Sequence, residues 1–455
     1  MITDIGAEGN AIARVDNLVV FVPMLIPGDV ADIRIIKKRK KYLEGKAVRL
    51  HEYSKDRIIP PCSHFGVCGG CKWQHLPYKL QLHFKEKQVK DSLLRIGKID
   101  IPEVRPIIGS ADQYHYRNKL EYTFSDKRWL TREEVNSDSF FEQEDALGFH
   151  IPGLFDKVLD ISECHLQPEP SNAIRDAVRR FARKNGYRFF NLRQQTGFLR
   201  NLIIRNSTDG KVMVIVVFFH DEPERRNALL DHLAAEFPQI SSLFYIINSK
   251  RNDSLSDQEP ELYKGDDHLT EIMDGLRFRI GPKSFYQTNT AQALKLYRIA
   301  RDFAGLTGSE IVYDLYSGTG TIANFVASGA AKVIGIEYIE DAVTDALSNS
   351  EMNKIMNTRF VAGDIKKVLS EQFFSEYGKP DVIITDPPRA GMHEDVVKAI
   401  IKASPRRIVY ISCNPSTQAR DILLLSEKYE VKAVQPVDMF PQTHHVENVV
   451  LLTLR

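Results

Sequence analysis

The chain has 455 residues, of which 43% are hydrophobic and 27% are charged, and its formal net charge is +1. This composition is typical of a globular protein of about three domains, and no apolar run reaches the roughly 18 residues that would indicate a membrane-spanning helix. The N-terminus, MITDIGAEGN, lacks the basic and then apolar pattern of a secretory signal, so we expect a cytoplasmic protein that binds no membrane and that holds any nucleic acid through local basic patches.

Residues 1–50 predict a small β-barrel. Short β-branched runs in NLVVFVPMLIPGDVADIRIIKK are interrupted by Pro-Gly-Asp, which is the pattern of strands joined by turns. The basic cluster KKRKKYLEGKAVR follows. An isolated charge run would indicate a solvated edge strand. On a small β module with interleaved aromatic and Gly residues, it favours a nucleic-acid-binding barrel of the OB type.

Residues 51–275 have a mixed composition that predicts an α+β central domain. The stretch YKLQLHFKEKQVKDSLLRIG (78–97) has helical spacing and ends on Gly. The stretch NSKRNDSLSDQEPELYKGDD (248–267) is polar and predicts a loop or the tip of a long hairpin. The segments with a strand-like composition are KLEYTFS (119–125), GFLRNLIIR (197–205) and KVMVIVVFF (211–219).

The first of these strands is preceded by a cluster of aromatic and basic residues. The stretch YHYRNKLEYTFS places Arg117 and Lys119 beside Tyr114, Tyr116 and Tyr122. The cluster fits an RNA-binding surface, on which aromatic rings stack on bases while the cations contact phosphates. It fits equally well an ordinary strand whose aromatic residues lie in the core.

The chain has five cysteines, an odd number that argues against a disulfide framework in a cytosolic protein. Cys62, Cys68 and Cys71 lie close together in CSHFGVCGGC, and Cys164 follows much later. Four cysteines could bind zinc or a [4Fe–4S] cluster, or remain free thiols. Their Cys-x5-Cys-x2-Cys spacing differs from the paired C-x2-C motifs of zinc ribbons and from the Cys-x3-Cys-x2-Cys motif of radical S-adenosylmethionine enzymes.

Residues 276–455 predict a doubly wound α/β domain. Seven short apolar strands alternate with helical stretches, which is the pattern of a largely parallel sheet covered by helices. Such sheets bind ligands at the carboxyl ends of their strands. The predicted strands are IVYDLYSG, AKVIGIEYI, TRFVAGDI, DVIITDPP, RIVYISCNP, VKAVQPVDMF and NVVLLTL.

A ligand site is predicted where the first of these strands enters a Gly-rich turn. In DLYSGTGTIA, which begins at Asp314, Gly318 and Gly320 allow the backbone to bend and to approach a ligand. A dinucleotide site would require G-x-G-x-x-G, which this turn lacks. The next three strands end in acidic residues, Glu337, Asp364 and Asp386. Carboxylates at successive strand ends suit a cationic or polyhydroxylated ligand better than a phosphate, unless they only cap helices.

A candidate nucleophile ends the fifth strand. Cys413 lies beside Asp386 and is followed by an Asn-Pro turn, so a thiolate there could attack an electrophilic carbon, although free Cys is more often a small buried hydrophobe. Carbon C5 of a pyrimidine becomes nucleophilic once a thiolate adds to C6, and a base must then remove the C5 proton. Glu447, just before the last strand, is the candidate base, and His444 and His445 are alternatives.

The motifs SCNPST, DPPRAG, FYQTN, DLYSGTGTIA and HHVENVVLL together resemble the RNA uracil-5-methyltransferase family, and the strand pattern resembles class I S-adenosylmethionine methyltransferases. The resemblance implies that Cys413 is the nucleophile and Glu447 the base. Arg389 follows the prolines here, whereas amino-methyltransferases have Tyr or Phe at that place. The residues that the resemblance assigns to the S-adenosylmethionine cofactor and the pocket around it are Gln287, Tyr316, Gly318, Thr321, Glu337, Asp364 and Asp386.

Two further segments resemble parts of the same family. The cysteine pattern resembles its iron–sulfur members, which implies a [4Fe–4S] cluster on Cys62, Cys68, Cys71 and Cys164, acting as a structural clamp, an RNA contact or a redox sensor. The segment GNAIARVDNLVVFVPMLIPGDV resembles a TRAM domain. The match begins almost at Met1, so either the barrel is shortened or the start codon lies elsewhere.

The resemblance implies methylation of C5 of a uridine in RNA. Iron–sulfur, TRAM-bearing relatives usually act on 23S rRNA, which we therefore expect as the substrate, with tRNA as the alternative. The uridine must be flipped out of its stack, and we expect a monomer without an obligate protein partner. A non-catalytic RNA-binding protein and an iron–sulfur redox sensor that binds a dinucleotide are less well supported. The intact Cys413 and Glu447 argue against the first, and the missing third glycine argues against the second.

Overall fold

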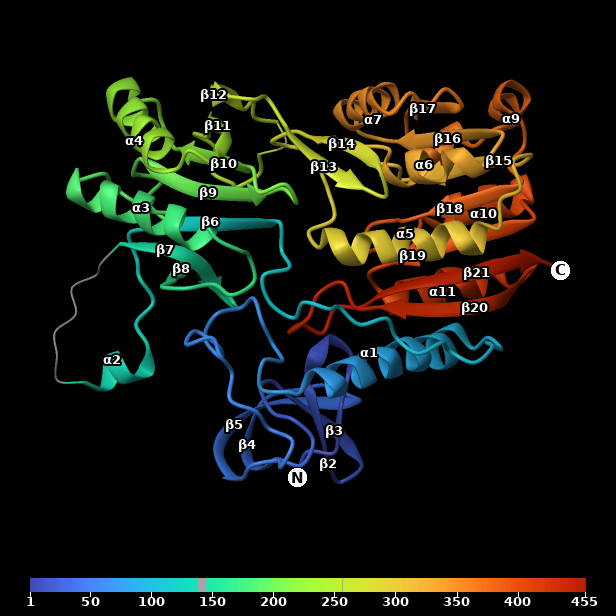
Figure 1. Ribbon diagram of the computed structural model, residues 1–455. Coiled ribbons are helices and arrows are strands. Elements are labelled where there is room, and N and C mark those ends of the chain that lie inside the picture. The colour runs from blue at the N-terminus through green and yellow to red at the C-terminus, as the bar shows by residue number, and fades with distance from the viewer. Residues whose placement is uncertain (138–144, 256) are drawn as a thin grey trace.

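The computed structural model describes residues 1–137, 145–255 and 257–455. Three parts are visible in Figure 1, namely an N-terminal barrel (blue), a central sheet (green) and a C-terminal sheet (orange to red). Helix α1 (Tyr78–Ser92) lies between the barrel and the C-terminal sheet. Within the described residues, no helix combines the length and the apolar character needed to cross a membrane.

The N-terminal sheet has the order β1-β2-β3-β5-β4 and is antiparallel except where β3 pairs with β5. Its strands are β1 (Asp4–Ile5), β2 (Ala11–Val15), β3 (Leu18–Val22), β4 (Val30–Lys38) and β5 (Tyr42–Glu52). Asp16 and Asn17, with φ of 47° and 64°, form the two-residue turn between β2 and β3, which matches the right-handed twist of a hairpin. The basic tip between β4 and β5 is exposed.

The central sheet has the order β12-β11-β10-β9-β6-β7-β8. One face packs on helices α3 and α4. The other face, which includes Met213, Ile215 and Val217 of β10, shares one hydrophobic core with the C-terminal part, so the two parts are packed together. The elements are β6 (Lys119–Ser125), β7 (Ala146–Ile151), β8 (Leu154–Asp160), β9 (Leu199–Asn206), β10 (Val212–Phe218), β11 (Ile240–Ile247), β12 (Glu261–Gly265), α3 (Ser171–Lys184) and α4 (Pro223–Glu236).

The three predicted strands of this region are confirmed as β6, β9 and β10. The polar stretch 248–267 includes the tip of a hairpin, one of its two predicted forms, because β11 and β12 pair antiparallel on either side of it. It differs from the prediction only in that its end is itself edge strand β12. Exposed residues such as Glu261 and Leu262 line this strand, so backbone pairing holds it and its composition gives little signal. Tyr116 and Tyr122 are buried, which favours the core-strand interpretation of that aromatic cluster.

The C-terminal sheet has the order β17-β16-β15-β18-β19-β21-β20, and all seven predicted strands are confirmed. Only β21 runs antiparallel to its neighbours. Both faces of the sheet are buried. Because successive side chains point to opposite faces, the strands are therefore apolar throughout. The strands are β15 (Ile311–Leu315), β16 (Lys332–Glu337), β17 (Thr358–Ala362), β18 (Val382–Thr385), β19 (Arg407–Ser412), β20 (Tyr429–Val437) and β21 (Glu447–Leu454).

Helices cover both faces of this sheet. Helices α5 and α6 pack on one face, while α10 and α11 pack on the other. The helices and the hairpin that precedes them are α5 (Thr290–Ala304), α6 (Thr321–Val326), α7 (Glu340–Met352), α8 (Ile365–Val368), α9 (Glu371–Tyr377), α10 (Glu394–Ala403), α11 (Pro415–Leu425), β13 (Leu269–Met273) and β14 (Leu276–Ile280). The remaining short helices are η1 (Ala7–Gly9), α2 (Arg132–Asn136), η2 (Leu93–Gly97) and η3 (Ala327–Gly329).

The predicted helix over 78–97 is confirmed as α1 followed by η2. Although it lies in the sequence range of the central domain, its Val89 and Leu93 join the core of the C-terminal sheet. Gly97 lies against α11, where a side chain would come within 3.3 Å of the Ala419 carbonyl. The helix therefore ties the start of the central region to the C-terminal sheet.

Candidate active site

The carboxyl edge of the C-terminal sheet brings Cys413, Asp386 and Glu447 together. Asp386 directly follows β18 and Cys413 directly follows β19, and these two strands are parallel neighbours. Glu447 begins β21, which runs the other way, and the pairing of Ser412 with Asn448 places Glu447 beside Cys413. The sheet register therefore produces the juxtaposition that the sequence predicts.

Burial sets the protonation of these three groups. Burial raises the pKa of both carboxyls, and the charge of Asp386 raises the pKa of Glu447 further. Burial, together with the charges of Glu447 and Asp386, raises the pKa of the Cys413 thiol to about 11. Arg389 has the opposite effect on Cys413 and Glu447, because its positive charge favours their anionic forms.

The turn after Cys413 is fixed by its neighbours. The backbone N–H of Asn414 donates to Ser412 Oγ at 3.1 Å. The Asn414 side chain caps α11 by accepting from the backbone N–H of Ser416 at 3.1 Å, and Pro415 takes the first helical position. The Asn414 amide also donates to the Arg389 carbonyl at 3.1 Å. Asn-Pro thus joins the cysteine turn to the loop that carries Asp386 and Arg389.

The histidines of the predicted site lie beside Arg389. The Arg389 guanidinium is 3.0 Å from His445 Nδ1, and the rings of His444 and His445 are 4.0 Å apart. Burial lowers the pKa of His444 to about 2 and that of His445 to about 4, and nearby cations add to the effect. Both imidazoles are therefore neutral and weakly basic at neutral pH.

The Gly-rich turn lies at the end of β15. Tyr316, Gly318 and Gly320 have φ of 64°, 52° and 73°, a left-handed geometry that is costly for tyrosine. The buried Asp314 carboxylate accepts from the backbone N–H of Ala323 at 2.9 Å, so it acts in part as a helix cap, while its other oxygen has no hydrogen-bond partner. The neighbouring Ser317 hydroxyl is likewise unpaired.

This turn leaves room for a ligand. A Cβ atom at Gly318 would meet no other atom within 4 Å, whereas one at Gly320 would come within 2.7 Å of Phe360. Gly318 therefore faces open space, and Gly320 is required by packing. The Glu337 carboxylate accepts from the Gly318 N–H at 2.9 Å, so it lies directly at the turn. The unpaired polar oxygens and the open face fit a polar small molecule.

The other predicted cofactor residues lie around this turn or farther away. Thr321 is the buried first residue of α6. Asp364 caps α8, and the charges of Asp364 and Glu337 contribute, after burial, to raising the pKa of Tyr316 to about 12. Gln287 precedes α5 and is held through its carbonyl, which accepts from Asn118 at 2.9 Å. No hydrogen bond or ion pair joins Gln287 to the other six among the described residues.

Sequence reasoning did not assign a role to two nearby residues. Tyr297 of α5 is buried close enough to Asp386 and Glu447 for their charges, after burial, to raise its pKa. Its spacing in the helix is that of a core residue, so the sequence gives no signal for it. Arg389 was identified only as a residue of the DPPR motif. Its positive charge is the one feature in the sequence that could have indicated an effect on nearby acidic groups.

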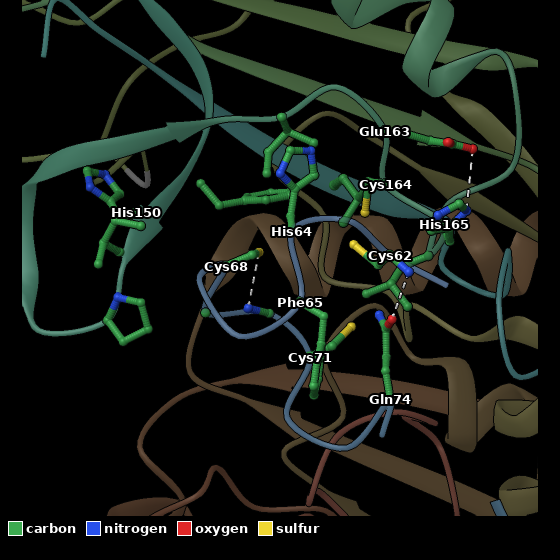
Figure 2. A pocket seen from close by; sticks show the side chains of 18 of the residues that line it. Cys62, His64, Phe65, Cys68, Cys71, Gln74, His150, Glu163, Cys164 and His165 are labelled. Carbon is green, nitrogen blue, oxygen red and sulfur yellow. Dashed lines mark hydrogen bonds and ion pairs between the residues drawn. The ribbon is translucent and has the colours of Figure 1, made fainter. Parts of the chain in front are cut away.

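The four remaining cysteines line a separate cavity of about 700 Å³, here called the cysteine cavity. Figure 2 shows the sulfurs of Cys62, Cys68, Cys71 and Cys164 around a common space. Burial raises the pKa of the Cys68 and Cys71 thiols to about 11 and about 12. The structure thus brings together the two cysteine segments, which the sequence separates widely.

The donor set of the cavity bears on which metal group it could hold. Within residues 1–137, 145–255 and 257–455, no three His, Cys, Asp or Glu side chains converge as ligands of one metal ion. In a [4Fe–4S] cubane each cysteine binds a different iron, so the four sulfurs stand farther apart than the ligands of a single zinc. The geometry of the cavity therefore does not itself show the cluster that the cysteine pattern predicts.

Comparisons with known families match both ends of the chain. A model of the TRAM domain matches residues 1–48, and a model of the tRNA (uracil-5-)-methyltransferase family matches residues 264–455. The second match covers the carboxyl edge of the sheet and the Gly-rich turn described above.

Relatives match over nearly the whole chain. An uncharacterized RNA methyltransferase of Bacteroides thetaiotaomicron is 60% identical over 452 residues, which is 99% of this chain and 100% of the relative. Another from Porphyromonas gingivalis is 56% identical and covers 99% of this chain and 98% of its own. The crystal structure of Pyrococcus abyssi tRNA (uracil-54, C5)-methyltransferase with S-adenosyl-L-homocysteine has a TM-score of 0.77 at 27% identity, covering 99% of both chains.

Proposed function

Since the chain belongs to the TRAM-bearing RNA uracil-5-methyltransferase family, we propose that it methylates C5 of a uridine through a covalent adduct between Cys413 and C6 of the base. The observation that carries this mechanism is the convergence of Cys413 and Glu447 at one edge of the sheet. Methylation of a nitrogen or oxygen would need no such thiol, because those atoms already have a lone pair.

The two residues divide the reaction between them. The Cys413 thiolate forms a bond to C6, and the electrons of the C5–C6 double bond make C5 nucleophilic. S-adenosylmethionine supplies the methyl group as an electrophile, which C5 takes. Glu447 then removes the C5 proton, the double bond re-forms and the sulfur leaves as thiolate. The uridine must be flipped into the site, since a stacked base cannot reach Cys413.

Glu447 is a better base than either histidine. Its carboxyl pKa is raised toward the working range by burial and by Asp386, and a general base works best when its pKa lies near the working pH. The pKa values of His444 and His445 are far below this range. We therefore assign the base to Glu447, with the histidines in the wall of the site.

The Gly-rich turn is the proposed cofactor site. Glu337 would hold the ribose hydroxyls, Asp364 would lie near the adenine, and Tyr316 would contact the cofactor through its constrained backbone. Gly318, with open space at its face, and Thr321 would complete the turn. Asp386 and Gln287 would line the pocket between the cofactor and the flipped base.

The cysteine cavity is the proposed site of a [4Fe–4S] cluster on Cys62, Cys68, Cys71 and Cys164. Support comes from the four sulfurs around one space. The role we favour is a structural clamp, because His64 accepts from the Ser162 N–H at 3.0 Å and so already joins the two cysteine segments.

We also propose that residues 1–50, 51–275 and 276–455 are the functional domains, and that the enzyme acts as a cytoplasmic monomer without an obligate protein partner.

The proposed RNA is 23S rRNA, because relatives with both the barrel and the four cysteines usually modify it. A second candidate is tRNA, which the structure from Pyrococcus abyssi favours because that tRNA enzyme matches this chain over its full length. The barrel alone therefore does not discriminate between the two RNAs.

The test is transfer of a labelled methyl group to separate 23S rRNA and tRNA preparations that lack 5-methyluridine, followed by nucleoside analysis. We expect 5-methyluridine in 23S rRNA, which Cys413→Ala should abolish. Label in tRNA alone would replace the proposed substrate, and label on another nucleoside would contradict the mechanism.

A further inference from the structure

Residues 438–446, here called the base loop, connect β20 to β21 and lead directly into Glu447. The loop has little regular structure of its own, so its conformation depends on a few internal hydrogen bonds and on contacts with other parts of the chain. These contacts come from helix α1, from Asn289 and Gln292 at the start of α5, from the two cysteine segments and from the barrel.

Helix α1 holds the start and the middle of the loop through one face. Lys85 and Asp438 form an ion pair of 2.5 Å in which both side chains are fully buried. Gln81 and Gln442 exchange two hydrogen bonds, since the Gln81 amide donates to Gln442 Oε1 at 3.0 Å and the Gln442 N–H donates to Gln81 Oε1 at 2.9 Å. The loop is therefore tied to a helix that begins shortly after Cys71.

The first cysteine segment contacts the base loop through backbone hydrogen bonds. The backbone N–H groups of Lys72 and Trp73, which directly follow Cys71, both donate to the Gln442 carbonyl, at 2.9 and 3.0 Å. Any shift of Cys71 must move these two donors, because they are one and two residues away along the chain.

The second cysteine segment reaches the loop through residues 115–117. The His115 N–H donates to the His165 carbonyl at 2.7 Å, and the Arg117 N–H donates to the Leu166 carbonyl at 2.8 Å. Between them, the buried Tyr116 hydroxyl donates to the Pro441 carbonyl at 3.0 Å. The residues after Cys164 are thus two hydrogen bonds away from the base loop.

The barrel packs against the base loop at Gly9. A side chain at Gly9 would come within 2.7 Å of His444 Cβ, and the Trp73 indole donates to the Gly9 carbonyl at 3.2 Å. Gly9 has φ of 78°, which favours glycine. The loop is therefore in contact with all three parts of the chain. Each cysteine segment is linked to the loop by a path of at most two hydrogen bonds.

We propose that Tyr116 and Gln81 are positioning residues for Glu447, through which the cysteine cavity fixes the base loop. This inference rests on the proposed function, in which Glu447 removes the C5 proton. Tyr116 binds the backbone of the loop, Gln81 binds the backbone and the side chain of Gln442, and neither touches the reacting atoms. The cavity has this effect because Cys71 and Cys164 anchor the segments that carry the donors.

The proposal makes a specific kinetic prediction. A displaced base loop moves Glu447 and the His445 that contacts Arg389, but it leaves the backbone of the Cys413 turn and of the cofactor turn in place, because these turns directly follow β19 and β15. Addition to C6 and methyl transfer should continue, while proton removal slows. A methylated covalent complex should then accumulate, which simple loss of stability would not produce.

The first experiment compares two matched tyrosines with unmodified RNA and S-adenosylmethionine. Tyr116→Phe removes a buried hydroxyl that donates to the Pro441 carbonyl. The control Tyr429→Phe removes another buried hydroxyl, which donates to the Pro405 carbonyl, also at 3.0 Å, at the far end of β20. We expect release to slow about tenfold in Tyr116→Phe, with adduct visible on a denaturing gel, and to stay normal in the control. If the two variants behave alike, the proposal is wrong.

The second experiment measures hydrogen exchange in the base loop of the full-length protein. Cys164→Ala should exchange its loop amides about tenfold faster than wild type, and Tyr116→Phe should change the same peptide. The matched control is Cys413→Ala, which removes a thiol outside the cysteine cavity. Amides of β10 report whether the fold is intact, and Tyr116→Phe carries the test alone if Cys164→Ala does not fold. Unchanged exchange in the loop contradicts the proposal.

The two readouts separate this inference from the proposed function. If wild type forms no 5-methyluridine and no adduct, the proposed chemistry fails whatever the exchange shows. If wild type does form them while Tyr116→Phe releases RNA normally, only the inference fails.

Discussion

The two reacting side chains of the proposed mechanism are held mainly in their protonated forms in the resting site. Burial and neighbouring carboxylates keep Cys413 a thiol with a pKa of about 11 and favour the protonated form of Glu447. Arg389 is the cation whose charge favours both anions. Arg389 therefore helps to make the nucleophile and the base available.

Replacing Glu447 with Gln should stop the reaction after methyl transfer. Cys413 can still add to C6 and C5 can still take the methyl group, but no carboxylate removes the C5 proton. We expect product formation to fall about 100-fold or more, with a covalent RNA complex on denaturing gels. Normal turnover by this variant would place the base elsewhere, and His444 or His445 would be the next candidate.

Replacing Arg389 with Gln should move the pH dependence upward. Loss of the positive charge raises the pKa of Cys413 and of Glu447, and both must be deprotonated to act. The acid limb of the profile of kcat/KM against pH should therefore shift by about one unit to higher pH. Arg389→Lys, which keeps the charge, should shift it less. An unchanged limb in Arg389→Gln would mean that neither group controls the rate.

Much of this site could be predicted from sequence, because strand ends of a doubly wound sheet share one edge. Cys413, Asp386 and Glu447 each adjoin the end or the start of a strand, so a count of strands was enough to bring them together. The left-handed backbone of Tyr316 and the contact between Arg389 and His445 could not be predicted. They depend on the exact course of loops that local patterns do not encode.

At the scale of whole elements, apolar strands were predictable. A polar edge strand, and the packing of a helix that lies between two parts of the chain, were not. Edge strand β12 was not predicted, because backbone pairing with β11, rather than burial of apolar side chains, stabilises it. Helix α1 was predicted as a helix, but its packing on the C-terminal sheet was not, since its partners lie hundreds of residues away in sequence. Its Lys85 is fully buried against Asp438, 353 residues away, and neither the burial nor the partner is visible in the sequence.

The ion pair between Lys85 and Asp438 should be the strongest link between α1 and the C-terminal sheet. Lys85→Met leaves Asp438 buried without its cation, so the free energy of unfolding should fall by about 3–5 kcal/mol. Lys85→Met combined with Asp438→Leu should lose less than the single variant. Chemical denaturation would show this, and equal losses would mean that Asp438 is satisfied by its other partners.

At the scale of the whole molecule, RNA binding must come from patches, since the net charge is only +1. The exposed tip between β4 and β5 carries Lys40 and Lys41 at the end of the barrel. We predict that RNA affinity falls steeply with salt. Neutralising both lysines to Gln should reduce the slope of log affinity against log salt by about 0.7–0.9 for each lost phosphate contact. An unchanged slope would place the RNA on another surface.

The measurement that tests the central claim most directly uses RNA containing 5-fluorouridine, with S-adenosylmethionine and either wild type or Cys413→Ala. Fluorine at C5 cannot leave as a proton does, so a thiolate that has added to C6 stays bound after methyl transfer. The account predicts a covalent complex that survives a denaturing gel with wild type and is absent with Cys413→Ala. RNA that binds wild type without forming this complex would contradict the adduct mechanism and would indicate that another atom is methylated.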